Sequence, residues 1–362
     1  MALNESIHIP AHYNIYNGKN DRELRVDFSI PDSGTNEHTG ILVFVPGFSG
    51  SIDSNIYKKM RNYFADSFNF VTVQCDYFGS RFMQSTDNWH LKGDFSTISH
   101  NFTEIELQQI YADNSKALQI LNTKNTQIHV MAKIDENLDE FADLGYMQAI
   151  DVLTAVEVVK IILQENELPF NDSNVIGYGH SQGGYILNLA NRLAPFVFSQ
   201  IVENSAWVRP EFFYRNRILR VKQNQLVIDM EFDYLGKSIL KDLDSLSVRN
   251  LFHDFKNGAY YHSYLGTTDI LIDIENKKST LKNIDFVDFQ LIDNSRIDGI
   301  AIKSTNHGLD ADFIKLLEMV FAKGVRHKNP NKKQLHYEII SSKTKIIVDY
   351  SDSLPIFHLK LL

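Results

Sequence analysis

The chain has 362 residues, which is enough for one large α/β domain with insertions. A formal net charge of −9 argues against a general binder of nucleic acid or of anionic membranes. The single cysteine, Cys75, excludes an internal disulfide, and no apolar run approaches the roughly 20 residues that span a bilayer. Because the first residues lack a basic and apolar leader, we expect a cytoplasmic protein without a membrane span.

Short apolar runs alternate with helix-spaced segments in the first part of the chain. Residues 7–10 and 24–31 predict an opening antiparallel pair of strands. The continuous apolar runs at 41–46 and 70–75 predict strands buried on both faces of a mostly parallel sheet, and residues 56–64 between them have helical spacing. This β-α-β order favours an α/β fold with helices on both faces of the sheet.

Three segments exceed what such a sheet needs. Residues 81–144 predict an insertion, and residues 206–256, which are rich in aromatic and basic side chains, predict a cap segment. Residues 334–362 predict a C-terminal extension that folds as a β-hairpin. We expect all three to belong to one domain, residues 1–362. The aromatic and basic residues from 212 to 220 could contact an acidic or sugar substrate, although a solvated, partly packed surface of the cap is the simpler interpretation.

A serine bracketed by glycines follows the apolar run that ends at Ile176. The pentapeptide Gly179-His180-Ser181-Gln182-Gly183 has the pattern G-x-S-x-G, and residues 185–193 after it have helical spacing. A serine on a tight strand-to-helix turn has a strained backbone, and the turn requires small residues two positions before and after it. Apolar residues at helical spacing over 147–162 predict a long amphipathic helix before this strand.

This segment resembles the nucleophile elbow of the α/β-hydrolase superfamily. The resemblance implies the α/β-hydrolase fold and a triad in the chain order serine, acid, histidine. Ser181 would then be the nucleophile, Asp269 in Gly-Thr-Thr-Asp the acid, and His307 the base. The backbone N–H groups of Phe48 and Gln182 would hold the oxyanion.

Other residues compete for these roles. Asp273 could replace Asp269 as the acid or could cap the following helix, and Glu203 is another candidate acid. His262 and His253 are rival bases, but the first falls in a strand pattern and the second in the cap segment. We expect His180 to be a packed residue rather than a second base.

The leading hypothesis for function is a serine-dependent acyl-ester hydrolase that works through an acyl-enzyme. We expect no cofactor, because zinc-binding and phosphate-loop motifs are absent from the sequence. An O-acyltransferase that moves an acyl group to a glycan hydroxyl and a non-catalytic binding module on the same scaffold are the alternatives. The segment from Gly145 to Asp151 is similar to an uncharacterised bacterial branch of hydrolase-like proteins, some of them associated with surface-glycan modification. This resemblance implies no established substrate, and we expect a small-molecule ester or a glycan ester.

Overall fold

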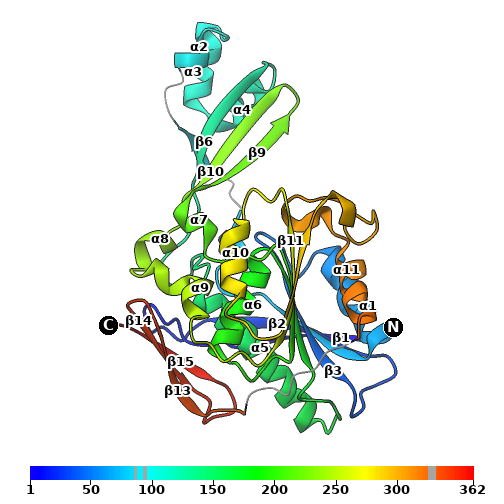
Figure 1. Cartoon of the computed structure of the whole chain (residues 1–362). Helices are drawn as coiled ribbons and strands as arrows, with labels where there is room; N and C mark the ends of the chain where they lie inside the picture. Colours follow the sequence, from blue (N-terminus) through cyan, green and yellow to red (C-terminus); the bar gives the residue numbers. More distant parts are fainter. Residues whose placement is uncertain (85–87, 93–95, 325–331) are drawn as a thin grey trace.

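The computed structural model describes residues 1–84, 88–92, 96–324 and 332–362. An eight-stranded sheet with helices on both faces forms its centre (Figure 1). From one edge to the other the strands are β1 (Leu3–Pro10), β2 (Glu23–Ile30), β4 (Phe70–Cys75), β3 (Gly40–Val45), β7 (Val175–His180), β8 (Gln200–Asn204), β11 (Tyr260–Gly266) and β12 (Val287–Ile292).

Strand β2 alone runs against the others. It pairs antiparallel with β1 and β4, whereas the remaining pairings in this sheet are parallel. Parallel strands bring their carboxyl ends to one edge, and ligands bind in α/β proteins outside that edge, where the strand order reverses. Here the reversal lies at β3, between β4 and β7. The chain has the α/β-hydrolase fold that the sequence predicted.

Helices form a layer on each face of the sheet (Figure 1). One layer consists of α1 (Asn55–Phe68) and α11 (Phe313–Ala322). It packs on the sheet through a core that contains Phe44, Ile176 and Leu317. The other layer consists of α5 (Tyr146–Glu165), α6 (Gln182–Leu193), α9 (Val248–Leu251) and α10 (Ile274–Leu281). The short connecting elements are α7 (Glu211–Tyr214), α8 (Gly236–Ile239), η1 (Ser80–Phe82), η2 (Leu243–Leu246), η3 (Asn294–Arg296) and η4 (His307–Asp310).

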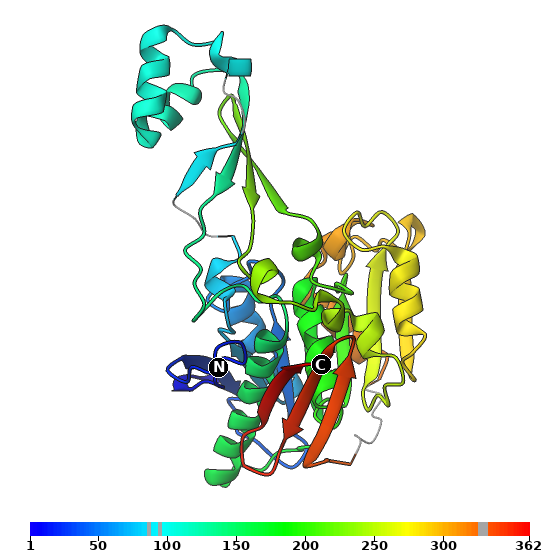
Figure 2. The same ribbon diagram turned by 90° about the vertical axis from the view of Figure 1, so that its left-hand side faces the viewer.

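Helix α5 is buried around most of its circumference and has no exposed polar face opposite an apolar one, so the amphipathic helix expected over 147–162 is wrong in that respect. Of its 20 residues, 16 are buried. The central sheet lies on one side of α5, and a smaller C-terminal sheet lies over the same helical layer (Figure 2). A helix that is packed between layers needs apolar side chains around its whole circumference.

The C-terminal sheet contains the expected hairpin and one further strand. Its strands are β13 (His336–Ser341), β14 (Thr344–Asp349) and β15 (Ile356–Leu361), each antiparallel to the next. Ile346, Val348 and Phe357 join the core of the α5 layer. The sheet is therefore packed onto the main body through apolar side chains.

A lobe stands apart from the central sheet, on the side of its carboxyl edge (Figures 1 and 2). It is built from β5 (Trp89–Leu91), β6 (Thr126–Ala132), β10 (Leu226–Phe232), β9 (Arg217–Gln223), α2 (Ser96–Ser99), α3 (Glu104–Ala112) and α4 (Asn114–Leu121). Strand β6 pairs parallel with β10. The segments 81–144 and 206–256, which we expected to be separate additions, thus contribute to one four-stranded sheet with a small core of its own.

Candidate active site

Ser181 lies on the turn between β7 and α6. Its backbone has φ 51° and ψ −116°, a conformation that costs a residue with a side chain about 1–3 kcal/mol. The turn places Ser181 in the wall of a cavity. It also leaves the first N–H groups of α6 without helical partners, so hydrogen-bond donors are available next to the hydroxyl.

The flanking glycines allow β7 and α6 to pack around this turn. A Cβ at position 183 would lie 2.0 Å from the carbonyl oxygen of Val45, and a Cβ at position 179 would lie 2.5 Å from the carbonyl carbon of Gly183. Both obstacles are backbone atoms, which cannot swing aside as a side chain can. The steric reason for the G-x-S-x-G pattern is therefore visible in the structure.

Ser181, His307 and Asp269 form one hydrogen-bonded chain. His307 Nε2 lies 2.8 Å from Ser181 Oγ, and His307 Nδ1 lies 2.8 Å from Asp269 Oδ2. Asp269 Oδ1 accepts the N–H groups of Leu271 and Ile272 at 2.8 and 3.0 Å, and its side chain is fully buried. Since the carboxylate accepts from Nδ1, Nε2 is the nitrogen free to receive the serine proton.

The loop that carries His307 is tied to the carboxyl ends of β8 and β11. Gly308 N–H donates to Ser205 Oγ, and Asn204 Nδ2 donates to the carbonyl oxygen of Gly308, each at 2.9 Å. The loop can approach Gly266 closely because this residue has no side chain. A Cβ at this position would lie 2.0 Å from the carbonyl oxygen of Thr305. These contacts fix the position of the His307 imidazole relative to the Ser181 side chain.

The loop between β3 and α1, residues 46–54, lies beside the elbow. Pairing of Val45 with Gly179 aligns the two strand ends, and a Cβ on Gly47 would lie 3.6 Å from Ser181 Cβ. In the part of the chain that the structure describes, the N–H groups of Phe48 and Gln182 donate to no other group. Two backbone donors thus flank the serine and have no acceptor of their own.

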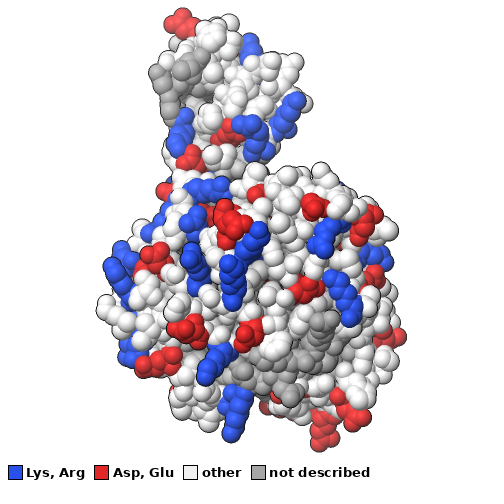
Figure 3. Space-filling view, viewed as in Figure 1, with Lys and Arg blue, Asp and Glu red and all other residues white. Residues whose placement is uncertain are grey.

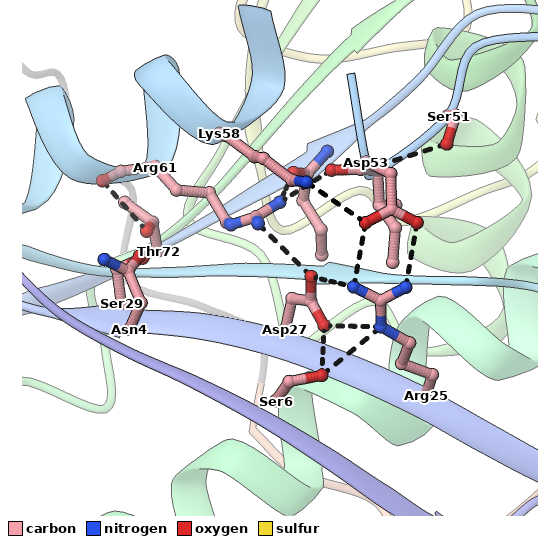
Figure 4. Close-up of polar contacts among 12 residues, drawn as sticks. Asn4, Ser6, Arg25, Asp27, Ser29, Ser51, Asp53, Lys58, Arg61 and Thr72 are labelled. Carbon is pink, nitrogen blue, oxygen red and sulfur yellow. Dashed lines mark hydrogen bonds and ion pairs between the residues drawn. The ribbon is translucent and has the colours of Figure 1, made fainter. Parts of the chain in front are cut away.

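A charged network holds the far end of this β3–α1 loop (Figure 4). Arg25 donates to both oxygens of Asp53 at 2.9 and 3.0 Å and to both oxygens of Asp27 at 2.9 Å. Arg61 donates to Asp27 and to the carbonyl oxygen of Ile52. The Arg25 guanidinium holds the pKa of Asp53 below its ordinary value. A rigid bidentate fork therefore connects strand β2 to the loop that carries Phe48.

The structure gives the competing residues other surroundings. Asp273 caps α10, where its side chain accepts the N–H of Asn276 at 2.7 Å. Glu203 is buried in an ion pair with Lys277. His262 is buried in β11, 3.4 Å from Asp288, and His253 is exposed beside Asp254. None of these four lines the cavity at Ser181.

His180 is packed, as we expected. Its ring stacks on Phe313 with centroids 3.5 Å apart, and burial lowers its pKa to about 3. The imidazole is therefore neutral at physiological pH and remains part of the cavity wall.

The cavity above Ser181, called the serine cavity below, has a volume of about 700 Å³. Its aromatic wall is formed by Phe48, Trp207 and Phe212. The rings of Phe48 and Trp207 each pack edge to face on the ring of Phe212. The charged and titratable side chains that line it are Tyr57, His180, Arg217, His307 and Asp310. Such a space accommodates a small or medium-sized ester.

The described ranges contain no cluster of metal ligands, and their one cysteine is buried. No group of three or more His, Cys, Asp or Glu residues there is arranged to bind a metal ion. Cys75 is buried and burial raises the pKa of its thiol, which disfavours the reactive thiolate. Among the helices that the structure describes, none is both long enough and apolar enough to cross a bilayer.

Sequence reasoning missed the residues that position the site. The sequence offered one indication for Asn204 and Ser205, because they lie at the carboxyl end of a predicted strand, where ligands bind in α/β proteins. Arg25 and Asp53 carried none, because their pairing joins segments that only the fold brings together.

Comparison with known proteins identifies the family. The model of a family described as a protein of unknown function, DUF2920, matches residues 18–239, which is more than half of the chain, and the chain belongs to this family. The matched range includes Phe48, Ser181 and Gln182 and ends before Asp269 and His307. No curated protein matches.

Solved structures with a similar course of the chain are distant in sequence. Est1E from Butyrivibrio proteoclasticus with bound ferulic acid is 13% identical, with a TM-score of 0.45 over 83% of this chain and 94% of that one. The acylaminoacyl peptidase of Pyrococcus horikoshii is 12% identical, with a TM-score of 0.46 over 91% and 43%. An alpha-beta serine hydrolase homologue from Coxiella burnetii is 12% identical, with a TM-score of 0.40 over 89% and 97%. Likenesses at this identity say nothing about the substrate of this chain.

Proposed function

We propose that this DUF2920 protein is a serine-dependent acyl-ester hydrolase with Ser181, His307 and Asp269 as its triad. The observation that carries the proposal is the hydrogen-bonded chain from Ser181 Oγ through His307 to Asp269, with both links at 2.8 Å. A serine hydroxyl needs a base in contact and an acid that orients that base. Ser181 and His307 line the wall of an open cavity, and the Asp269 side chain is buried next to the imidazole.

In the first half of the reaction, Ser181 Oγ attacks the carbonyl carbon of the ester. His307 Nε2 accepts the serine proton and then donates it to the departing alkoxide, so that an alcohol leaves and the acyl group stays on the serine. Asp269 stabilises the transient imidazolium through Nδ1–H. Because two backbone N–H groups already hold its other oxygen, the carboxylate needs no rearrangement during the step.

In the second half, water attacks the acyl-enzyme. His307 accepts a proton from the water and returns it to Ser181 Oγ, which releases the carboxylic acid. In both halves the negative oxygen of the tetrahedral intermediate is bound by the N–H groups of Phe48 and Gln182. Loss of one such donor typically lowers the rate by about 10²- to 10³-fold.

The test is hydrolysis of short aryl esters by the wild type and by Ser181→Ala, His307→Ala and Asp269→Asn variants. We expect each variant to lose at least about 10³-fold in kcat, because the three groups act as a unit. Asp273→Asn and Glu203→Gln are the controls for the two competing candidates for the acid. Asp273→Asn alters only the cap of α10. Full activity of Ser181→Ala would refute the proposal.

Acyl transfer to a glycan hydroxyl through the same acyl-enzyme is the alternative outcome. The lobe contributes Arg217 to the serine cavity, so an acceptor could be held there in competition with water. The ratio of free acid to acylated glycan in the products separates the two reactions. A non-catalytic binding module would instead retain its biological activity after Ser181→Ala.

A further inference from the structure

Arg217 places a cation without a counter-ion in the wall of the serine cavity. It is the first residue of β9 and lines the cavity together with Ser181 and His307. Its Nη2 donates to Gln84 Oε1 at 3.3 Å, whereas its Nε is buried and has no acceptor. Among the described residues, no carboxylate forms an ion pair with this guanidinium.

Two neighbouring arginines have carboxylate partners, whereas Arg215 donates to the carbonyl oxygen of Leu271 at 3.5 Å and forms no ion pair among the described residues. Arg209 pairs with Glu211 at 3.3 Å, and Arg220, three positions along β9, pairs with Asp229 at 2.7 Å. Acidic and basic side chains are mixed around the junction of lobe and main body (Figure 3). Of these arginines, Arg217 alone combines a place in the wall of the serine cavity with a guanidinium that has no carboxylate partner in the described residues.

The guanidinium is close to the groups that would hold the reacting ester. Its Cζ lies 5.3 Å from the centre of the Phe212 ring, and Phe212 packs edge to face on Phe48 at 4.7 Å. Trp207, also in the cavity wall, has a buried Nε1 without an acceptor. Donors without acceptors thus gather on the aromatic wall, and the one carboxylate lining the cavity, Asp310, forms no ion pair with Arg217 in the described residues.

We propose that Arg217 determines substrate specificity by binding a carboxylate group of the ester. A partly buried charge without a partner is unfavourable, and a substrate carboxylate would supply the missing acceptors in a bidentate pair. The inference rests on the proposed ester hydrolysis and adds the substrate class: an acyl ester that carries a free carboxylate, on either its acyl or its alcohol half. Burial lowers the pKa of Arg217, but an arginine side chain keeps its charge in proteins.

Two matched pairs of esters test this. Para-acetoxybenzoate and para-acetoxybenzamide differ in charge on the alcohol half, and para-nitrophenyl hemiadipate and its terminal amide differ on the acyl half. In one pair, we expect the wild type to prefer the carboxylate in kcat/KM by about 10- to 100-fold. Arg217→Gln should reduce that ratio to about one, and Arg217→Lys should retain part of it, because lysine keeps the charge without the fork.

Arg220→Gln is the matched control, since it removes a neighbouring arginine that already has a partner. It should keep the wild-type ratio. A wild-type ratio near one in both pairs, or a ratio that survives Arg217→Gln, overturns the inference. If the wild type hydrolyses the neutral esters without preference, the proposed function stands and only this inference fails.

Binding decides the question if the wild type hydrolyses none of the four esters. Calorimetric titration of Ser181→Ala with each pair then measures recognition without turnover. Tighter binding of the carboxylate member, lost in Ser181→Ala/Arg217→Gln, supports the role of Arg217 even though the proposed function has failed. Equal binding of both members overturns it.

Discussion

At the scale of single residues, the conformation of Ser181 depends on the absence of a Cβ atom at Gly179 and Gly183. Its strained backbone persists because α6 packs directly onto the strand end, and this contact exists only while positions 179 and 183 have no Cβ. The strain and the exposed hydroxyl thus have the same cause. A substitution at either glycine changes the shape of the elbow before it changes any chemical group.

Gly183→Ala tests this steric account. The new Cβ would lie 2.0 Å from the backbone oxygen of Val45, whereas in Gly177→Ala it would lie 2.8 Å from the end of the Leu187 side chain. We expect Gly183→Ala to cost roughly 3 kcal/mol or more and Gly177→Ala about 1 kcal/mol, because a side chain can move and the backbone cannot. Urea unfolding measures both. Equal costs would show that the elbow has more room than its geometry indicates.

Single residues also show where prediction from sequence stops. The elbow could be predicted because G-x-S-x-G records a local steric requirement, and Asp269 and His307 followed from chain order in the superfamily. Arg217 could be suspected of contacting a substrate, but its lack of a partner is a tertiary property. The sequence supplies Asp, Glu and Arg residues on both sides of it, and only the fold decides which of them pair.

At the scale of elements, the β3–α1 loop is held from outside the site. Arg25 donates two hydrogen bonds to the carboxylate of Asp53, and Arg61 donates one to the carbonyl oxygen of Ile52. Both contacts lie a few residues beyond Phe48, whose N–H is one proposed oxyanion donor. These residues touch no reacting atom, so we regard them as positioning residues.

Arg25→Lys should therefore lower kcat by about 3- to 10-fold and leave KM nearly unchanged, since small displacements of a donor weaken transition-state binding. Lysine keeps the charge and loses the bidentate geometry. Lys19→Gln, which removes the exposed pair with Asp139, is the control and should change neither constant. A change in KM alone would argue against a positioning role.

A second element-level contact joins the N-terminal segment to β15. His12 Nδ1 lies 2.8 Å from the carbonyl oxygen of Tyr13, and its Nε2 accepts the N–H of Phe357 at 2.9 Å. Burial lowers the pKa of His12 to about 4 from 6.5. Protonation would convert the acceptor nitrogen into a donor that faces another donor.

Because the unfolded chain binds this proton more readily, His12 should stabilise the fold above pH 6.5 and lose that contribution as the pH falls towards 4. The full effect is about 3 kcal/mol. Urea unfolding of the wild type and His12→Gln across this range measures it, and the difference between them should shrink at low pH. A difference that does not vary with pH would mean that His12 does not titrate in this window.

Pairings between elements were less predictable than the elements themselves. Buried parallel strands such as β3 and β4 are recognisable as continuous apolar runs. The pairing of β6 with β10 joins segments about 100 residues apart, and hydrophobic periodicity contains no information about partners. Two additions were therefore expected where the chain builds one lobe, and a hairpin where β15 adds a third strand.

At the scale of the whole molecule, the proposed triad and the lobe belong to separate cores. Leu121, Ile128 and Leu226 form part of the lobe core, whereas Leu317 belongs to the core between the central sheet and α11. The lobe reaches the serine cavity through Arg217 at its base. Local opening of the lobe should thus leave the reacting groups in place.

Leu121→Ala and Leu317→Ala provide a matched comparison, because both side chains are fully buried. Each should cost about 2–5 kcal/mol in its own core. We expect Leu121→Ala to raise hydrogen exchange in β6 and β10 only, and Leu317→Ala to raise it throughout the central sheet. Exchange that increases in the central sheet after Leu121→Ala would contradict separate cores.

The most direct test of the central claim, that Ser181 is the nucleophile of a serine hydrolase, is the intact mass of the protein after treatment with a fluorophosphonate. We expect one phosphonyl adduct on the wild type, located at Ser181 by peptide mapping, and none on Ser181→Ala or His307→Ala. An unlabelled wild type, or an adduct that persists in Ser181→Ala, would contradict this claim.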